Sequence, residues 1–105
     1  MRPIKLQLRE EIAADDFMKK CVITGETNIR KISWEHCWTY GKEGQINEKW
    51  AIVPLRRDLN IAPMKIETKE KCRLASLNRA TKEDLAKYPK KNWQQIHKYL
   101  KSKYE

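Results

Sequence analysis

The chain lacks the sequence features of membrane, secreted and repeat proteins. No segment approaches the roughly 20 consecutive apolar residues that a membrane-spanning helix requires, and residues 1–5 lack the apolar run of a secretory signal. There is no internal repeat or low-complexity tract, and the four prolines stand apart from one another instead of forming a linker. From these absences we expect a soluble protein of the cytoplasm with no membrane partner.

Cysteine is also scarce, which argues against a small disulfide-stabilised fold. Cys21, Cys37 and Cys72 are an odd number of cysteines at wide spacing, so we expect free thiols in a reducing compartment. A structural zinc site would need closely spaced pairs such as C-x-x-C, and the chain contains none. We therefore expect no structural zinc.

What the chain has in excess is positive charge. Its 105 residues are 40% hydrophobic and 35% charged, which fits one small domain with a modest core. The formal net charge is +9; residues 61–105 hold 12 basic and 5 acidic side chains, whereas residues 1–60 hold 11 and 9. A positive field of this kind attracts polyanions and releases their counterions on binding. Nucleic acid is therefore the expected partner.

The first third of the chain suggests two extended segments around a turn. Residues 4–8 alternate apolar and polar side chains, which predicts a short strand or an extended arm. Residues 21–28 begin apolar and contain a glycine, which predicts a tight turn. Residues 29–35 alternate again, so we expect a half-buried strand that ends at the Glu35–His36 pair.

The middle of the chain predicts a hairpin followed by a helix. Residues 41–45 contain two glycines and are typical of a loop, and residues 50–53 predict a second short strand. Pro54 suits the first turn of a helix, where its missing N–H costs nothing, which predicts a helix over residues 55–60. The expected order is strand, loop, strand, helix.

Beyond Pro63 the pattern becomes helical. Residues 69–79 carry apolar side chains at roughly helical spacing, Thr81 is a capping residue before acidic side chains, and Pro89 ends that short helix. Asn92 is suited to cap a last helix. The apolar stripe of that helix consists of Trp93, Ile96, Tyr99 and Leu100.

The segment from Trp34 to Asn60 combines an acid–histidine pair, a glycine-containing loop and a short apolar strand. This combination resembles the motif of the HNH, or ββα-metal, nucleases over about residues 21–60. In that family an acid–His or His–His pair ends the first strand, and a helix after the second strand supplies a further metal ligand. The resemblance implies an α+β fold in one domain over residues 1–105: a ββα-metal (HNH) hairpin–helix core with additional helices in a basic extension over residues 61–105.

A softer likeness concerns residues 77–89, which look like the C-terminal part of small phage-borne HNH proteins. This likeness implies a bacteriophage protein that works in the cytoplasm of its bacterial host. It also implies a phage or host recombination or replication protein as a further partner.

Carried over residue by residue, the HNH resemblance implies that Glu35 binds a divalent metal, His36 deprotonates the attacking water and Asn60 completes the protein ligands. Imidazole titrates near neutral pH, which suits a general base, and a metal ion can hold the scissile phosphate. Two oxygen ligands favour a hard ion, so we expect Mg²⁺ first and Mn²⁺ second. Asp58, which carries a full charge, is the alternative second ligand.

The chain departs from the family pattern in two ways. Many HNH nucleases brace the hairpin with a zinc held by two C-x-x-C pairs, and here only Cys21 stands at such a place. The other three places hold residues that are not zinc ligands: Thr24, Arg56 and Leu59. The central Asn of the motif aligns with Ala51, and the usual final His aligns with Asn60. We therefore expect packing to replace the zinc brace.

The candidates for nucleic-acid contact lie near the motif and in the C-terminal half: Arg56, Arg57, Lys42, Tyr40, Lys90 and Lys91. The leading hypothesis is a metal-dependent HNH-type endonuclease that hydrolyses phosphodiester bonds in DNA. One alternative is a non-catalytic nucleic-acid-binding protein on a degenerate HNH scaffold, and another is a protein-interaction factor that uses the apolar stripe of the last helix. Phosphate contacts do not distinguish DNA from RNA or one sequence from another, and the oligomeric state stays open.

Overall fold

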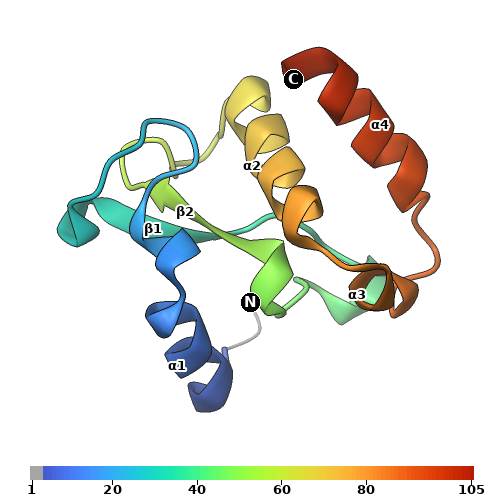
Figure 1. Ribbon diagram of the computed structural model, residues 1–105, viewed down its shortest axis with the longest axis horizontal. Coiled ribbons are helices and arrows are strands. Elements are labelled where there is room, and N and C mark those ends of the chain that lie inside the picture. The colour runs from blue at the N-terminus through green and yellow to red at the C-terminus, as the bar shows by residue number, and fades with distance from the viewer. Residues whose placement is uncertain (1–3) are drawn as a thin grey trace.

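The computed structural model describes residues 4–105, which are arranged around one antiparallel β-hairpin (Figure 1). The hairpin consists of β1 (Ile32–His36) and β2 (Ile52–Arg56). Four α-helices complete the described part of the chain: α1 (Leu6–Ala14), α2 (Ile66–Arg79), α3 (Lys82–Ala86) and α4 (Trp93–Tyr104). The protein is therefore a small α+β domain, in agreement with the predicted fold class at this level.

Strand β2 is buried on both of its faces. Side chains alternate between the two faces of a strand, so Val53 and Leu55 point one way and Ile52 points the other way. Val53 and Leu55 belong to a core cluster that includes Cys72 of α2, whereas Ile52 packs in a second cluster with Ile12 of α1. Helix α2 thus covers one face of the hairpin, and the N-terminal segment covers the other (Figure 1).

The predicted helix over residues 55–60 is wrong. Strand β2 continues through Arg56, and Pro54 lies inside it, opposite Trp34. The chain then makes a turn, and the next helix begins only at Ile66. The second strand itself is confirmed, but it lies two to three residues further along than the predicted residues 50–53.

The hydrogen-bond pattern of the hairpin explains why a proline is accepted there. The N–H of Cys37 donates to the Ala51 carbonyl at 3.0 Å, and the N–H of Arg57 donates to the Lys31 carbonyl at 2.8 Å. In an antiparallel ladder, pairs that exchange such bonds alternate with pairs that do not. This alternation, followed from either end of the hairpin, makes Trp34 and Pro54 a pair that exchanges no backbone hydrogen bond. Its missing N–H therefore costs the ladder nothing.

The predicted strand over residues 4–8 is also wrong, because residues 6–14 form helix α1. Leu8 and Ile12 are four residues apart, so they lie on the same side of a helix. Ile12 is fully buried and Leu8 packs against the same cluster. The apolar positions in residues 4–8 are therefore the beginning of a helical pattern that extends to Ile12.

The predicted strand over residues 29–35 is confirmed in part, because residues 29–31 form a 3₁₀ turn and β1 begins at Ile32. The predicted helices of the C-terminal half are confirmed, although Tyr99 of the predicted apolar stripe is exposed. Helix α2 covers the predicted residues 69–79 and begins three residues earlier. The Thr81 side chain accepts the N–H of Asp84 at 3.1 Å, and the Asp84 side chain accepts the N–H of Thr81 at 2.9 Å, which forms a complete capping box at α3. The Asn92 side chain accepts the N–H of Gln95 at 3.3 Å and begins α4.

Tryptophan side chains join α4 to the hairpin loop. The Trp93 ring meets the rings of Trp38 and Trp50 edge to face, with centroids 5.0 and 5.8 Å apart. The Trp38 indole N–H donates to the Ser76 hydroxyl of α2 at 2.7 Å. All three tryptophans are buried, so aromatic bulk supplies much of this small core.

Asp15 holds the N-terminal segment against the rest of the domain. Its carboxylate accepts hydrogen bonds from the Arg79 guanidinium at the end of α2 and from the N–H of Phe17, and Lys49 lies 3.7 Å away. Burial, the largest single influence, raises the pKa of Asp15. The hydrogen bonds and the two positive charges outweigh that influence and leave the pKa below its ordinary value of 3.8.

We expect the substitution Asp15→Asn to destabilise the protein by about 1–3 kcal/mol at pH 7, because Arg79 would lose a charge-assisted partner. A carboxyl whose pKa is lowered by folding stabilises the protein above its unfolded pKa, and this contribution is lost as the pH falls through the folded value. Thermal melts should therefore show a Tm difference between Asp15→Asn and wild type that shrinks as the pH falls below about 4.

Asp16→Asn is the matched control, because Asp16 is 95% exposed and pairs only with Lys19 on the surface. Surface pairs contribute little, so its Tm should stay close to that of wild type. An equal loss of stability in both variants would contradict the assigned role of Asp15.

Candidate functional site

Glu35 lies half-buried on β1, on the side of the hairpin that α2 covers. Burial raises the pKa of Glu35 above its ordinary value, and the charges of Lys69 and Arg73 on α2 only partly offset this effect. A carboxyl in surroundings that disfavour its charge lowers the stability of the fold at neutral pH. Such groups are concentrated at functional sites, which makes Glu35 the first candidate.

Asn60 is brought to the same side of β1. Its side-chain amide donates to the Ser33 hydroxyl at 2.9 Å, and that hydroxyl donates to the Leu55 carbonyl at 2.9 Å. Ser33 and Glu35 are two positions apart on the strand, so their side chains share a face. The amide of Asn60 is thus anchored on the face that carries Glu35. Ser33 was not identified from the sequence, although its spacing from Glu35 is the signal that would have marked it.

Asp58, the alternative ligand, lies in a surface ion pair instead. It is 62% exposed and accepts a hydrogen bond from the Arg56 Nε at 2.6 Å. That hydrogen bond lowers the pKa of Asp58 and raises the pKa of Arg56. The charge of Asp58 is therefore engaged by Arg56, and Asn60 is the better placed partner for Glu35.

His36 lies on the opposite face of the hairpin from Glu35, because consecutive strand side chains alternate. Its Nε2 is 2.7 Å from the Asn47 Oδ1. With the Asn47 oxygen as acceptor, Nε2 carries the proton, and Nδ1 is then the basic nitrogen of the ring. The structure therefore places Asn60 on the face of β1 that carries Glu35, and it places His36 on the opposite face beside Asn47.

Asn47 is the site residue that the sequence analysis missed. The motif alignment assigned the central position to Ala51, which is fully buried and has only a methyl group to offer. The amide that meets His36 comes from four residues earlier, in the long loop between the two strands. The conformation of the loop decides which asparagine side chain contacts His36, and this conformation cannot be predicted from the spacing of residues in the sequence.

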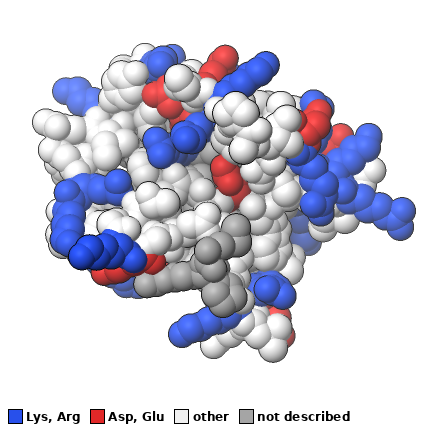
Figure 2. Space-filling model, turned by 180° about the vertical axis from the view of Figure 1, so that it is seen from behind, with Lys and Arg blue, Asp and Glu red and all other residues white. Residues whose placement is uncertain are grey.

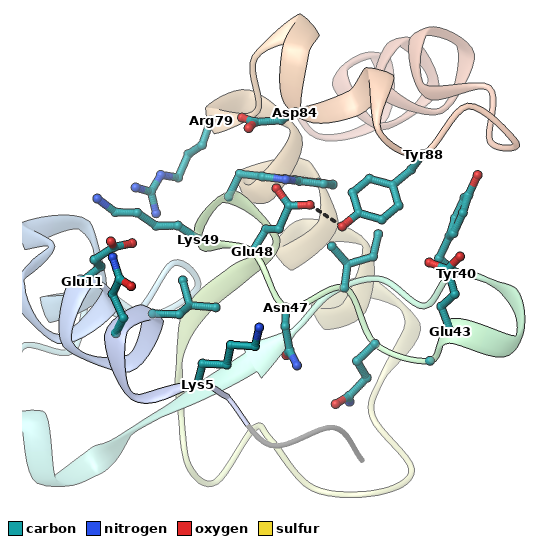
Figure 3. A pocket seen from close by; sticks show the side chains of 16 residues that line it. Lys5, Glu11, Tyr40, Glu43, Asn47, Glu48, Lys49, Arg79, Asp84 and Tyr88 are labelled. Carbon is teal, nitrogen blue, oxygen red and sulfur yellow. Dashed lines mark hydrogen bonds between the residues drawn. The ribbon is translucent and has the colours of Figure 1, made fainter.

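A groove of about 1020 Å³ opens on the His36 side of the hairpin, between α1, the hairpin loop and α3. Asn47 lines it, and Figure 3 shows Glu48 and Tyr88 pointing toward one another across its wall, where the Tyr88 hydroxyl donates to Glu48. Its charged lining is mixed in sign: Glu11, Glu43, Glu48, Asp84, Lys5, Lys49 and Arg79. This groove therefore has no surplus of positive charge with which to hold a polyanion.

The predicted nucleic-acid contacts divide between the two ends of the hairpin. Tyr40 lies at the loop end, and it is buried, with its hydroxyl accepting the N–H of Lys90 at 3.0 Å. Lys42 is exposed in the same loop, and Lys91 is half-buried in the turn before α4. Tyr40 is thus engaged in packing, whereas the lysines around it face the surface.

Arg56 and Arg57 lie at the other end, where β1 begins and β2 ends. Arg56 is paired with Asp58, whereas the exposed Arg57 donates its Nε to the Arg30 carbonyl at 3.0 Å. That carbonyl is neutral, so the charge of Arg57 is not neutralised by the contact. Of the two arginines, Arg57 is therefore the more available for a phosphate.

Hydrogen bonds to sulfur hold the turn that begins at Cys21. The Cys21 Sγ accepts backbone N–H groups from Ile23 and Thr24 at 3.4 Å and from Arg56 at 3.2 Å. Burial, the largest single influence, raises the pKa of this thiol, but the hydrogen bonds together lower it below its ordinary value. These contacts tie the turn over residues 21–28 to the end of β2.

Comparisons with family models, with curated proteins and with solved structures find no significant match for this chain. Among residues 4–105, no group of three or more His, Cys, Asp and Glu side chains is placed to hold a metal ion together. No helix in that range has the length and apolar character needed to span a bilayer. Glu35, Asn60 and His36 are therefore the described residues from which a function can be inferred.

We expect Glu35→Gln to raise the Tm at pH 7 by a few degrees, because folding places the Glu35 charge where solvation is poor. A carboxyl whose pKa is raised by folding destabilises the protein above its folded pKa, and the effect disappears as the pH falls below the unfolded value near 4.5. Melts of Glu35→Gln and wild type across this range should converge at acid pH.

Glu67→Gln is the control, because folding lowers the pKa of Glu67 and raises that of Glu35. Glu67 is 68% exposed, and its hydrogen bond with Lys71 lowers its pKa. Its replacement should leave the Tm unchanged or slightly lower at pH 7. A Glu35→Gln variant that is less stable than wild type at pH 7 would show that Glu35 has a structural role.

Proposed function

We propose that this protein is a metal-dependent endonuclease of the HNH type that hydrolyses phosphodiester bonds in DNA. The observation that supports it most is the half-buried Glu35, which shares one face of a β-hairpin with the anchored amide of Asn60. The helix that follows the hairpin packs over this face and carries Lys69 and Arg73 toward it. The resemblance to HNH nucleases implies a metal ligand on the helix after the second strand, whereas Asn60 lies in the turn between β2 and α2.

The residues present fit a weakly held Mg²⁺ better than a tightly held transition metal. Glu35 supplies one carboxylate and Asn60 one amide oxygen, since the Asn60 amide nitrogen is engaged by Ser33. Mg²⁺ is commonly bound by one or two carboxylates, with waters and substrate phosphates completing its shell. The metal would hold the scissile phosphate and stabilise the leaving oxygen.

His36 would act as the general base through Nδ1, with Asn47 holding the ring by its Nε2 hydrogen. Because Glu35 and His36 point to opposite faces, one phosphate can reach both only at the edge of the sheet. Among residues 4–105, strand β1 pairs with β2 on one side alone, so no other described strand lies beside its second edge. A DNA strand lying across this edge near Glu35 and His36 would meet both side chains.

The same arrangement supports a second candidate function. If the bound strand stays on one face of β1, then Glu35 and His36 do not act together, and the protein is a non-catalytic nucleic-acid-binding module. The separation of His36 from Glu35 and Asn60 favours this alternative. A cleavage assay separates the two candidates.

We expect the purified protein to nick supercoiled plasmid with Mg²⁺ or Mn²⁺ and to be inactive in EDTA. His36→Ala should reduce the rate at least about 100-fold while leaving DNA binding unchanged, because general-base catalysis contributes typically 10²–10⁴-fold. His97→Ala is the matched control, since His97 also places its Nε2 2.7 Å from an asparagine oxygen, that of Asn78, on the α2–α4 surface. DNA binding without metal-dependent nicking in wild type would establish the second candidate instead.

The metal ligands are tested by the Mg²⁺ concentration that gives half-maximal nicking. Asn60→Asp adds a charged oxygen ligand beside Glu35 and should lower this concentration. Asp58→Asn should leave it unchanged, because Asp58 is engaged by Arg56 at the surface. The reverse result, an effect of Asp58 and none of Asn60, would make Asp58 the second ligand.

A further inference from the structure

The open end of the hairpin carries an unusual combination of exposed apolar and cationic side chains. We define the open-end surface by six residues that lie where β1 begins, where β2 ends and where α2 starts: Lys31, Arg57, Ile61, Lys65, Ile66 and Lys69. Ile61 is 63% exposed and Ile66 is 74% exposed, which places them among the most exposed large apolar side chains of residues 4–105. Isoleucine at this exposure contributes nothing to the core.

Hydrogen bonds join the parts of this surface that lie at the ends of the two strands. The N–H of Arg57 donates to the Lys31 carbonyl at 2.8 Å, which joins the ends of the two strands. The Asn60 amide is held by Ser33 of β1, so Ile61 must leave the hairpin beside the start of that strand. The open-end surface therefore adjoins the face that carries Asn60 and Glu35.

The first turn of α2 extends the same surface. Lys69 lies close enough to Glu35 for its charge to act on that carboxyl. Ile66 is three residues before Lys69 and therefore lies on the same side of the helix, and Lys65 is the residue immediately before the helix. Ile61 follows Asn60, and Ile66 lies one helical turn before Lys69, so both isoleucines are close in the chain to residues of the candidate site.

The positive charges of this surface are not neutralised. Within residues 4–105, Lys31, Arg57, Lys65 and Lys69 form no ion pair, although Lys71, Lys87 and Lys103 each pair with a glutamate. The nearby acids are already engaged, Asp58 by Arg56 and Glu67 by Lys71. In Figure 2, which views the molecule from behind, Lys and Arg side chains project together at the right-hand edge, where the open end of the hairpin lies.

We propose that the open-end surface binds nucleic acid, with its four cations on the phosphate backbone and with Ile61 and Ile66 against bases that are unstacked at the bound step. The positive charges favour a polyanion as the ligand. The two exposed isoleucines favour a polyanion that has apolar surface beside its phosphates. Nucleic acid exposes such a surface when apolar side chains enter between its bases. The inference rests on the proposed function, because it places the substrate of that site across the open end of the hairpin.

Binding is measured in EDTA, so that cleavage is not needed, with a DNA duplex that carries 2-aminopurine at its centre. The fluorescence of this base rises when it is unstacked, and the salt dependence of the affinity counts phosphate contacts. The wild-type protein should bind and raise the fluorescence. Wild-type protein that binds neither duplex nor single-stranded DNA would overturn the proposed function itself, which distinguishes that failure from a failure of the surface assignment.

The cations are tested with two matched double variants. Lys31→Gln with Lys65→Gln should lower the slope of log affinity against log salt by about 2, because each lost phosphate contact lowers it by about 0.9. Lys98→Gln with Lys101→Gln removes the same charge from exposed positions on α4 and should leave the slope unchanged. If the α4 variant lowers the slope and the open-end variant does not, DNA binds elsewhere and the proposal is wrong.

The isoleucines are tested in the same assay. Ile61→Ser with Ile66→Ser should keep the salt slope, weaken binding several-fold and abolish the rise in fluorescence. Leu6→Ser is the control, because Leu6 is 69% exposed on α1, away from the open end. All of these side chains are exposed, so thermal melts should show that the variants stay folded. A fluorescence rise that persists without the isoleucines would overturn the base contact.

Discussion

The structure depends on the burial of β2, where Ile52, Val53, Pro54 and Leu55 are all shielded from solvent. A strand that is apolar on both faces must be covered on both faces, because leaving either one exposed would forfeit the hydrophobic stabilisation that a small domain needs most. Helix α2 supplies one cover, and the N-terminal segment supplies the other. Because β1 pairs with β2 and its side chains alternate between the two faces, Glu35 lies on the face packed against α2 and His36 lies on the face packed against the N-terminal segment. The proposed function has to account for this separation.

Two carboxyls on either side of this hairpin show opposite relations to stability. Asp15 in the N-terminal segment pairs with Arg79 at the end of α2. This ion pair and the hydrogen bonds to Asp15 stabilise its charge, so its pKa is lowered. Glu35 faces Lys69 and Arg73 without an ion pair within residues 4–105, and burial raises its pKa. Carboxyls with a raised pKa are concentrated at functional sites, which is why the proposed function starts from Glu35 and not from Asp15.

Several elements could be predicted because their signals are local. The capping box at Thr81 and the cap at Asn92 are hydrogen bonds between residues three apart, and the structure forms both. The strand that ends at Glu35 and His36 follows from a period-two pattern. Pro54 was misassigned because its effect depends on which ladder pair it occupies, and that pairing is set by contacts with β1 about 20 residues away. The N-terminal helix was missed because five residues cannot distinguish alternation from a helical period.

The sequence by itself determined the positive charge, the absence of a disulfide framework, the helical C-terminal half and the Glu35–His36 pair at the end of a strand. Composition, capping and periodicity act over short distances, so no partner segment is needed to recognise them. Only the tertiary structure decided that Asn60 bonds Ser33 on the face that carries Glu35, and that Asn47 lies beside His36. It also decided that Tyr40 is buried while Ile61 and Ile66 are exposed. These outcomes depend on how loops close and on which face each helix covers, and such long-range geometry leaves no local trace in the chain.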